Sequence, residues 1–227
     1  MTEMQFRHEY KHILNAGDAI LLRARLSAVM EKDPHVGEDG FYTIRSLYFD
    51  TPSDKALREK VSGVSEREKF RIRIYNDDLS FIRLEKKVKK GGLGYKVSAP
   101  LSKEETERLI AGDYSWMATK KDGLVVELYS KMQTELLRPK TIVQYRREPF
   151  IHTAGNVRIT LDYDVRTGLL STDLLNPDTP LIPASPGTVI LEVKYDNFLP
   201  TSVRDVIQLL HRGESAFSKY EACRRYL

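Results

Sequence analysis

The chain has 227 residues, of which 41% are hydrophobic and 30% are charged, so it can bury a sizeable core. A single cysteine excludes an internal disulfide framework and a cysteine-based zinc site, and the absence of an apolar N-terminal segment or a bilayer-length apolar run predicts a cytoplasmic protein. The 36 Lys and Arg exceed the 32 Asp and Glu by a net charge of only +4, which is too weak by itself to indicate a polyanionic partner.

Capping signals predict helices at intervals along the chain. Asn15 or Asp18 begins a helix that runs to about residue 30. Its predicted apolar stripe consists of Ile20, Leu21, Leu26 and Val29. A short helical turn begins at residue 53, and Ser102 with Glu105 forms a capping box for a helix that ends at Gly112. Further helices are predicted at residues 124–137 and 201–210 and in the tail from residue 215.

Between the helices lie segments rich in β-branched and aromatic residues, which predict strands. They are residues 5–12, 42–50, 69–75, 80–89, 95–101, 141–151, 157–166 and 188–195. Hairpin turns at 76–78 and 91–94 favour an antiparallel sheet, and we expect an α+β fold in which about eight strands close into a barrel with helices outside. Residues 171–187, with four prolines, predict a long surface loop. No repeat or composition break divides the chain, so we expect one domain over residues 1–227.

Charged residues recur at alternate positions of five predicted strands, and alternate residues of a strand share one face. The sets are Arg7, Glu9 and Lys11; Lys69, Arg71 and Arg73; Arg83, Glu85, Lys87 and Lys89; Arg158, Asp162 and Asp164; and Glu192 and Lys194. For one strand alone, a solvated outer face is the usual explanation. The predicted helices, however, need the apolar faces for docking. We therefore expect the charged faces to line the inside of the barrel.

Cations crowded inside a barrel repel one another unless an anion lies between them, and a phosphate chain suits the donors of Arg and Lys. Carboxylates interleaved with these cations do not suit a bare anion site. Mg²⁺ or Mn²⁺, in contrast, binds one or two carboxylates together with substrate phosphates. The candidate ligands are Glu9, Glu85, Asp162 and Glu192. The pattern predicts a phosphate site that also holds a divalent metal, Mn²⁺ or Mg²⁺.

Short motifs spread over nearly the whole chain carry a family resemblance. They are RHEYKH at 7–12, SLYFD at 46–50, FRIRIY at 70–75, LEKK at 84–87, YRREPF at 145–150, RITLD at 158–162, LEVK at 191–194 and FSKY at 217–220. Any one of them alone is weak. As an ordered set, they resemble the VTC-type polyphosphate polymerase domain, a branch of the CYTH/triphosphate tunnel metalloenzyme superfamily.

The resemblance implies an eight-stranded antiparallel tunnel in which the γ-phosphate of ATP is transferred to a growing polyphosphate chain and ADP is released. The catalytic residues it implies are Lys11, Arg71, Arg73, Lys87, Arg147, Arg158, Glu192 and Lys219. Glu192 matches the acidic metal ligand of the family. Further candidates for phosphate binding are Arg7, Lys60, Lys89, Lys194 and Ser218.

Two other functions fit the same pattern, namely hydrolysis of inorganic, thiamine or nucleoside triphosphate and non-catalytic binding of polyphosphate. Hydrolases of the superfamily carry Glu-x-Glu-x-Lys, whereas Arg7 replaces the first acid here, which favours the polymerase. A pure binder would leave the carboxylates without a purpose. We expect no nucleic-acid partner, because no exposed aromatic platform accompanies the basic residues. We expect any membrane partner to be a separate protein, and the sequence leaves the oligomeric state open.

Overall fold

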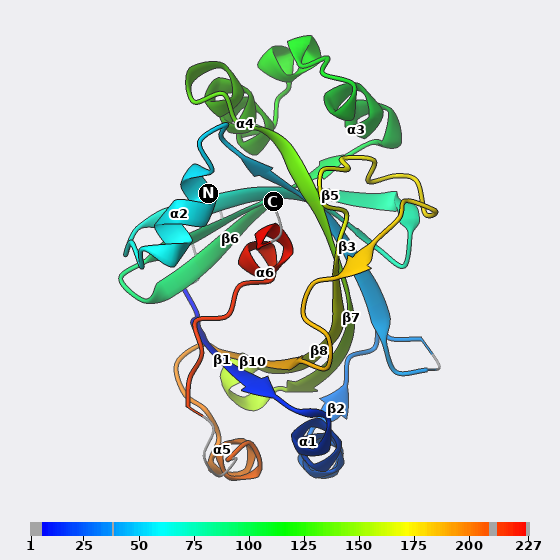
Figure 1. Ribbon diagram of the computed structural model, residues 1–227. Helices are drawn as coiled ribbons and strands as arrows, with labels where there is room; N and C mark the ends of the chain where they lie inside the picture. Colours follow the sequence, from blue (N-terminus) through cyan, green and yellow to red (C-terminus); the bar gives the residue numbers. More distant parts are fainter. Residues whose placement is uncertain (1–5, 38, 209–212, 226–227) are drawn as a thin grey trace.

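The computed structural model describes residues 6–37, 39–208 and 213–225. Its centre is a curled antiparallel sheet with the strand order β1-β10-β8-β7-β3-β4-β5-β6 (Figure 1). The bounds are β1 (His8–Leu14), β3 (Tyr42–Asp50), β4 (Arg67–Tyr75), β5 (Asp78–Lys90), β6 (Leu93–Leu101), β7 (Arg138–His152), β8 (Val157–Thr167) and β10 (Val189–Tyr195). Two short strands, β2 (Glu31–Lys32) and β9 (Ile182–Pro183), pair with β7 and β8. The eight longer strands are the ones that the sequence predicted.

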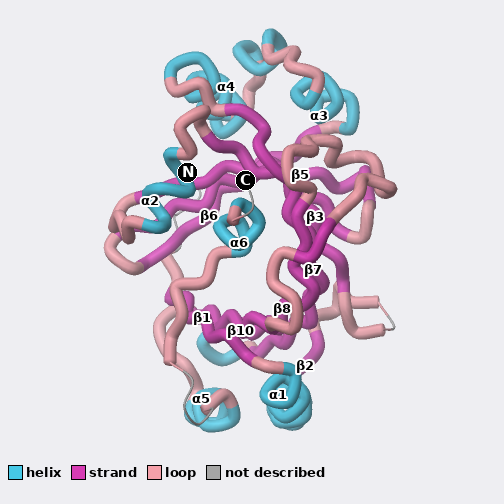
Figure 2. The backbone as a smooth tube through the Cα atoms, in the orientation of Figure 1, coloured by secondary structure: helices cyan, strands magenta, loops and turns pink. Residues whose placement is uncertain are grey.

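In the described part of the chain, six α-helices accompany the sheet. They are α1 (Ala16–Val29), α2 (Lys55–Val61), α3 (Lys103–Ile110), α4 (Gly123–Thr134), α5 (Thr201–Val206) and α6 (Lys219–Arg224), with 3-10 turns at Ser115–Thr119 and Ala154–Asn156. Figure 2 shows α3 and α4 outside one end of the sheet, α1 and α5 outside the other, and α6 within the curl. None of the described helices is long and apolar enough to span a membrane. The predicted helix at 201–210 ends earlier, at Val206, and residues 209 and 210 lie outside the described part, as does residue 5 of the first predicted strand.

The sheet is open and does not close into the predicted barrel. Its edges are β1 and β6, and in the described chain a single isolated bridge joins them, where the Arg7 N–H donates to the Gly94 carbonyl at 3.1 Å. Farther along β1, the Ser215 N–H donates to the Lys11 carbonyl at 2.7 Å. The prediction of a closed barrel was wrong because the C-terminal segment, rather than β6, contacts this part of β1.

Two apolar layers cover the outside of the curl. Ile72 of β4 and Leu84 of β5 are fully buried in the layer under α3 and α4. The layer under α1 and α5 contains Leu22 and Leu26 of α1. The predicted stripe of α1 is only partly right, because Ile20 is 65% exposed and Leu21 is 47% exposed. The buried residues of α1 are Ala19, Leu22 and Leu26, which share one face at the spacing of 3.6 residues per turn.

The predicted loop at 171–187 is irregular except for β9, and it is firmly anchored. Leu174 is 0% exposed in the apolar layer under α3 and α4. The buried guanidinium of Arg45 donates to the carbonyls of Asn176 and Pro177 at 3.0 and 3.1 Å. The segment is thus packed against β3 and contributes to the core.

Asp50 ties α2 and α6 to the end of β3. Its carboxylate is buried and accepts hydrogen bonds from the Ala56 N–H at 2.9 Å, the Leu57 N–H at 3.2 Å and the Tyr220 hydroxyl at 2.7 Å. Burial and the charge of Asp50 raise the pKa of the Tyr220 hydroxyl, so this group stays a hydrogen-bond donor. Asp50 therefore fixes α6 inside the curl, where Figure 1 shows it.

Replacing Tyr220 with phenylalanine is expected to lower the free energy of unfolding by about 1–3 kcal/mol, because it leaves a buried carboxylate short of a donor. Tyr10→Phe is the matched control, since the Tyr10 hydroxyl is exposed and its loss should cost less than about 0.5 kcal/mol. Urea denaturation of both variants measures the difference. Equal stabilities would show that Asp50 does not depend on Tyr220.

Candidate functional site

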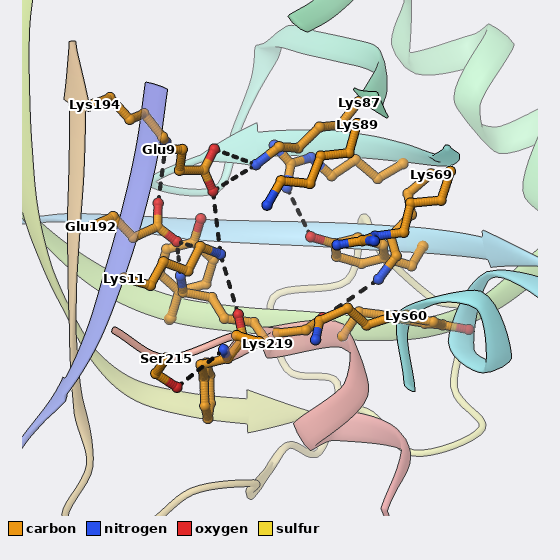
Figure 3. Close-up of a pocket in the computed structure, with 18 of the residues that line it drawn as sticks. Glu9, Lys11, Lys60, Lys69, Lys87, Lys89, Glu192, Lys194, Ser215 and Lys219 are labelled. Carbon is orange, nitrogen blue, oxygen red and sulfur yellow. Dashed lines mark hydrogen bonds and ion pairs between the residues drawn. The ribbon is translucent and has the colours of Figure 1, made fainter. Parts of the chain in front are cut away.

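The curl encloses a cavity of about 400 Å³ whose walls are dominated by cations (Figure 3). The cations are Lys11, Lys60, Arg67, Lys69, Arg71, Arg73, Lys87, Lys89, Arg147, Lys194 and Lys219. They come from β1, α2, β4, β5, β7, β10 and α6. The carboxylates that line the cavity are Glu9, Glu192 and Glu214. The inner face of the sheet is therefore strongly basic, as the alternating charges predicted.

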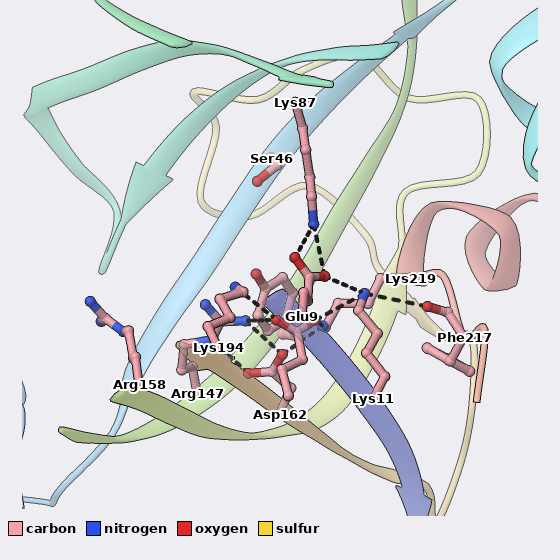
Figure 4. Close-up of polar contacts among 12 residues, drawn as sticks. Glu9, Lys11, Ser46, Lys87, Arg147, Arg158, Asp162, Lys194, Phe217 and Lys219 are labelled. Carbon is pink, nitrogen blue, oxygen red and sulfur yellow. Dashed lines mark hydrogen bonds and ion pairs between the residues drawn. The ribbon is translucent and has the colours of Figure 1, made fainter. Parts of the chain in front are cut away.

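Most of the residues singled out from the sequence meet at this cavity, including Ser218 beside α6. Four of the candidate site residues do not line the cavity. Glu85 and Asp162 are buried next to its lining residues, and Arg7 and Arg158 lie outside the lining. The Arg7 guanidinium contacts Asp196 at 2.7 Å. Arg158 contacts Asp33 at 2.6 Å, and Figure 4 shows its side chain apart from the central cluster.

Glu192 of β10 is the centre of the charge network. Its Oε1 lies 2.7 Å from Lys219 Nζ and 3.2 Å from Lys11 Nζ, and its Oε2 lies 3.1 Å from Lys194 Nζ and 3.2 Å from the Arg147 guanidinium. Burial by itself would raise the pKa of Glu192, but the surrounding lysines outweigh it and hold that pKa well below its usual range. Glu192 is therefore an ionised carboxylate at every pH near neutrality.

Asp162 pairs with two of these cations, Arg147 and Lys219, without lining the cavity itself. It is 0% exposed, and both of its oxygens accept from the Arg147 guanidinium, at 2.6 and 2.7 Å. Lys219 Nζ contacts the same carboxylate at 2.5 Å. A bidentate pair fixes the plane of a guanidinium. Asp162 thus orients Arg147 toward the cavity.

Glu85 of β5 orients the two arginines of β4, as Asp162 orients Arg147. It is 2% exposed and lies 2.7 Å from Arg71 and 3.6 Å from Arg73. Its other oxygen contacts Lys96 of β6 at 2.6 Å. Tyrosine hydroxyls provide further partners for these arginines, namely Tyr48 at 2.8 Å from Arg71 and Tyr145 at 3.2 Å from Arg73.

Glu9 of β1 faces the cavity from the edge of the sheet. Its two oxygens lie 2.8 and 2.6 Å from Lys87 Nζ, and Lys11 Nζ is 3.4 Å away (Figures 3 and 4). Although burial acts to raise its pKa, Lys87, Lys194 and Lys11 hold the pKa of Glu9 well below its usual range. Glu9 and Glu192 therefore present two ionised carboxylates to one cavity.

Several residues of the site were missed in the sequence. Lys96, Tyr48 and Tyr145 contact its charged groups, and Arg67 lines the cavity. Arg67 stands two residues before Lys69 and continues the alternating charges of β4, so the sequence pattern could have identified it. Residues 214–217, which also line the cavity, carry no such pattern.

The donor set fits a divalent metal that is held mainly by substrate. Among the described residues no group of three or more His, Cys, Asp or Glu could hold a metal on its own. Glu9 and Glu192 do reach the cavity, and Mg²⁺ commonly binds one or two carboxylates together with phosphate oxygens. Glu85 and Asp162, the other two predicted ligands, are paired with guanidinium and ammonium groups and do not line the cavity.

Comparison with known families gives a match over nearly the whole chain. The model of the VTC domain family matches residues 6–227. No curated protein matches the sequence.

Solved structures of low sequence identity are similar in fold. A Hippeastrum protein, described as a candidate adenylyl cyclase with a dominant triphosphatase activity, superposes with a TM-score of 0.52 at 13% identity, over 97% of this chain and 95% of that one. A candidate adenylate cyclase from Bacillus halodurans has a TM-score of 0.46 at 16% identity, over 88% of this chain and 84% of the other. At such identities the likeness concerns the fold alone.

Proposed function

The chain belongs to the VTC domain family, and on this premise we propose that it is a polyphosphate polymerase that moves the γ-phosphate of ATP onto a growing polyphosphate chain and releases ADP. The observation that carries the proposal is the cavity, in which cations from seven elements converge on a space of about 400 Å³ with ionised Glu9 and Glu192 among them. A site of this charge suits a condensed phosphate chain with a divalent metal.

In the proposed reaction, positioning and charge neutralisation do most of the work, since phosphoryl transfer needs little covalent chemistry from the protein. Arg71 and Arg73, oriented by Glu85, and Arg147, oriented by Asp162, would hold phosphate oxygens with their guanidinium forks. Lys11 and Lys219 would add point charges. Glu9 and Glu192 would hold Mn²⁺ or Mg²⁺, which supplies further neutralisation of phosphoryl oxygens when bound.

Hydrolysis of a triphosphate is the competing function, and the triphosphatase activity in the description of the Hippeastrum protein favours it. The residues at the start of β1 argue against hydrolysis. A hydrolase must place a water in line and usually activates it with a carboxylate. Arg7, which stands where hydrolases of this superfamily have an acid, cannot serve as a base, and its guanidinium is engaged with Asp196. This difference supports transfer to a phosphate acceptor.

Incubation of the purified protein with ATP and Mn²⁺ or Mg²⁺ tests the proposal directly. We expect ADP and long polyphosphate, seen on a gel, with little orthophosphate. The same reaction with excess EDTA is the control and should give no product. Stoichiometric orthophosphate without polymer at any ATP concentration would assign the chain to the triphosphatases.

A further inference from the structure

The cations that line the cavity fall into two groups with different partners. Those around Glu192 and Glu85, together with Lys87 beside Glu9 and Lys60 beside Glu221, are paired with carboxylates. Arg67, Lys69 and Lys89 also line the cavity, but none of the three forms an ion pair with a carboxylate of the described residues. The cavity thus has one region where cations are already neutralised and one where they are not.

The unpaired region follows from the register of β4 and β5. Arg67 lies directly opposite Lys89, and Lys69 lies directly opposite Lys87. Two positions farther along, the same register places Arg71 opposite Glu85. Like charges that face each other across two strands destabilise a sheet. Lys87 is paired with Glu9, but Arg67, Lys69 and Lys89 have no carboxylate partner among the described residues, so an anion placed among these three would reduce their repulsion. At Arg71 the sheet supplies its own counter-charge.

Lys69 is the member of this group whose protonation can change near neutral pH. Its Nζ lies 3.5 Å from the Ser218 hydroxyl and 5.1 Å from the centre of the Tyr220 ring. The charged groups that face it from the surrounding elements are Lys87 of β5, Arg67 of β4, Lys11 of β1, Lys60 of α2 and Asp50 of β3. Burial, followed by repulsion from the neighbouring cations, lowers the pKa of Lys69 to about 7. Lys69 can therefore lose its proton near neutral pH when no anion is bound.

We propose that Arg67, Lys69 and Lys89 form a second anion subsite, at the end of the cavity next to α2, which binds phosphate groups of a condensed phosphate chain without a metal and takes up a proton on Lys69 as it does so. The proton comes from the solvent and converts the amine into an ammonium group that donates to phosphate oxygens. Figure 3 shows Lys69 and Lys60 across the cavity from Glu9 and Glu192.

The proposal deepens the proposed function and rests on it, because it divides one phosphate chain between two environments. Phosphates that share a divalent metal would lie by Glu9 and Glu192, whose carboxylate oxygens can coordinate it. Metal-free phosphates of the acceptor chain would lie by Arg67, Lys69 and Lys89. The two ends of a bound phosphate chain would therefore differ, one lying with a metal beside the carboxylates and the other lying without a metal among the unpaired cations.

Calorimetric titration with sodium tripolyphosphate in EDTA, at about pH 8 and in buffers of different ionisation enthalpy, counts the protons taken up. The whole chain is compared with Lys69→Arg, whose side chain stays protonated. Wild type should take up close to one proton more per triphosphate than the variant. Because the pKa of Lys69 is about 7 in the free protein, the Kd of wild type should rise more steeply above pH 7 than that of the variant, in which Lys87, with a pKa of about 8, still titrates. Lys69→Met should abolish the extra uptake and weaken binding.

Equal proton uptake by wild type and Lys69→Arg would overturn the role of Lys69. Binding of triphosphate only when a divalent metal is present would overturn the metal-free subsite. Either result could accompany normal synthesis of polyphosphate from ATP, in which case the proposed function stands and the second subsite alone is lost. A protein that binds no triphosphate with or without metal would refute the proposed function itself.

Discussion

Replacing both Arg71 and Arg73 with alanine is expected to weaken triphosphate binding by about a hundredfold or more. A cation 4 Å from a phosphate charge contributes about 1 kcal/mol in water and about 4 kcal/mol at an effective dielectric of 20, and each 1.4 kcal/mol is a factor of ten in Kd. Both guanidinium groups are nearly buried at the cavity wall, so the loss should exceed the value in water. Calorimetric titration with tripolyphosphate measures the change.

The double variant should also be less stable, because Glu85 is 2% exposed and, of its ion-pair partners among the described residues, keeps only Lys96. Adding Glu85→Gln should recover much of that stability without recovering affinity. Arg146→Ala is the matched control, since Arg146 is exposed, contacts Asp39 at 3.7 Å and the Phe41 ring, and lies outside the cavity lining. Undiminished affinity in the double variant would refute the assignment of this cavity as the phosphate site.

The alternation of charge was enough to predict which strand faces line the cavity. β3 begins and ends at the predicted residues 42 and 50. On β4, Arg71 and Arg73 point inward while Phe70, Ile72 and Ile74 are buried in the outer apolar layer, as a period of two requires. The prediction succeeded because the two faces of the sheet are chemically distinct, the inner face basic and the outer face apolar. The alternation of charged and apolar residues along a strand therefore indicates which of its faces points inward.

The pairing of charges could not be predicted, because it depends on the register in which two strands pair, which the pattern of each strand alone does not give. Asp162 and Arg147 meet only because β7 and β8 pair in the register that places them opposite each other. Lys96 also reaches Glu85 from β6, the strand that pairs with β5. Likewise, the motif FSKY does not reveal that α6 lies inside the curl. That position depends on Asp50, which is distant in the chain.

Replacing Glu192 with glutamine is expected to lower metal-dependent turnover by at least about a hundredfold, because a neutral amide is a poor ligand for a hard dication. Metal-free triphosphate should bind as tightly as in wild type, or more tightly. The four cations around Glu192 remain, and one negative charge facing the phosphates is removed. Turnover is measured with ATP and Mn²⁺, and binding is measured by calorimetry in EDTA.

Glu221→Gln is the control for the loss of a carboxylate near the site, since Glu221 contacts Lys60 at 3.5 Å but does not line the cavity. It should leave turnover within a few-fold of wild type. The opposite responses of turnover and metal-free binding are what distinguish a metal ligand from a structural partner. A purely structural Glu192 would, on removal, leave Lys11 and Lys219 less ordered and weaken binding with and without metal alike. Retention of most wild-type turnover by Glu192→Gln would reduce Glu192 to a counter-ion of the lysines around it.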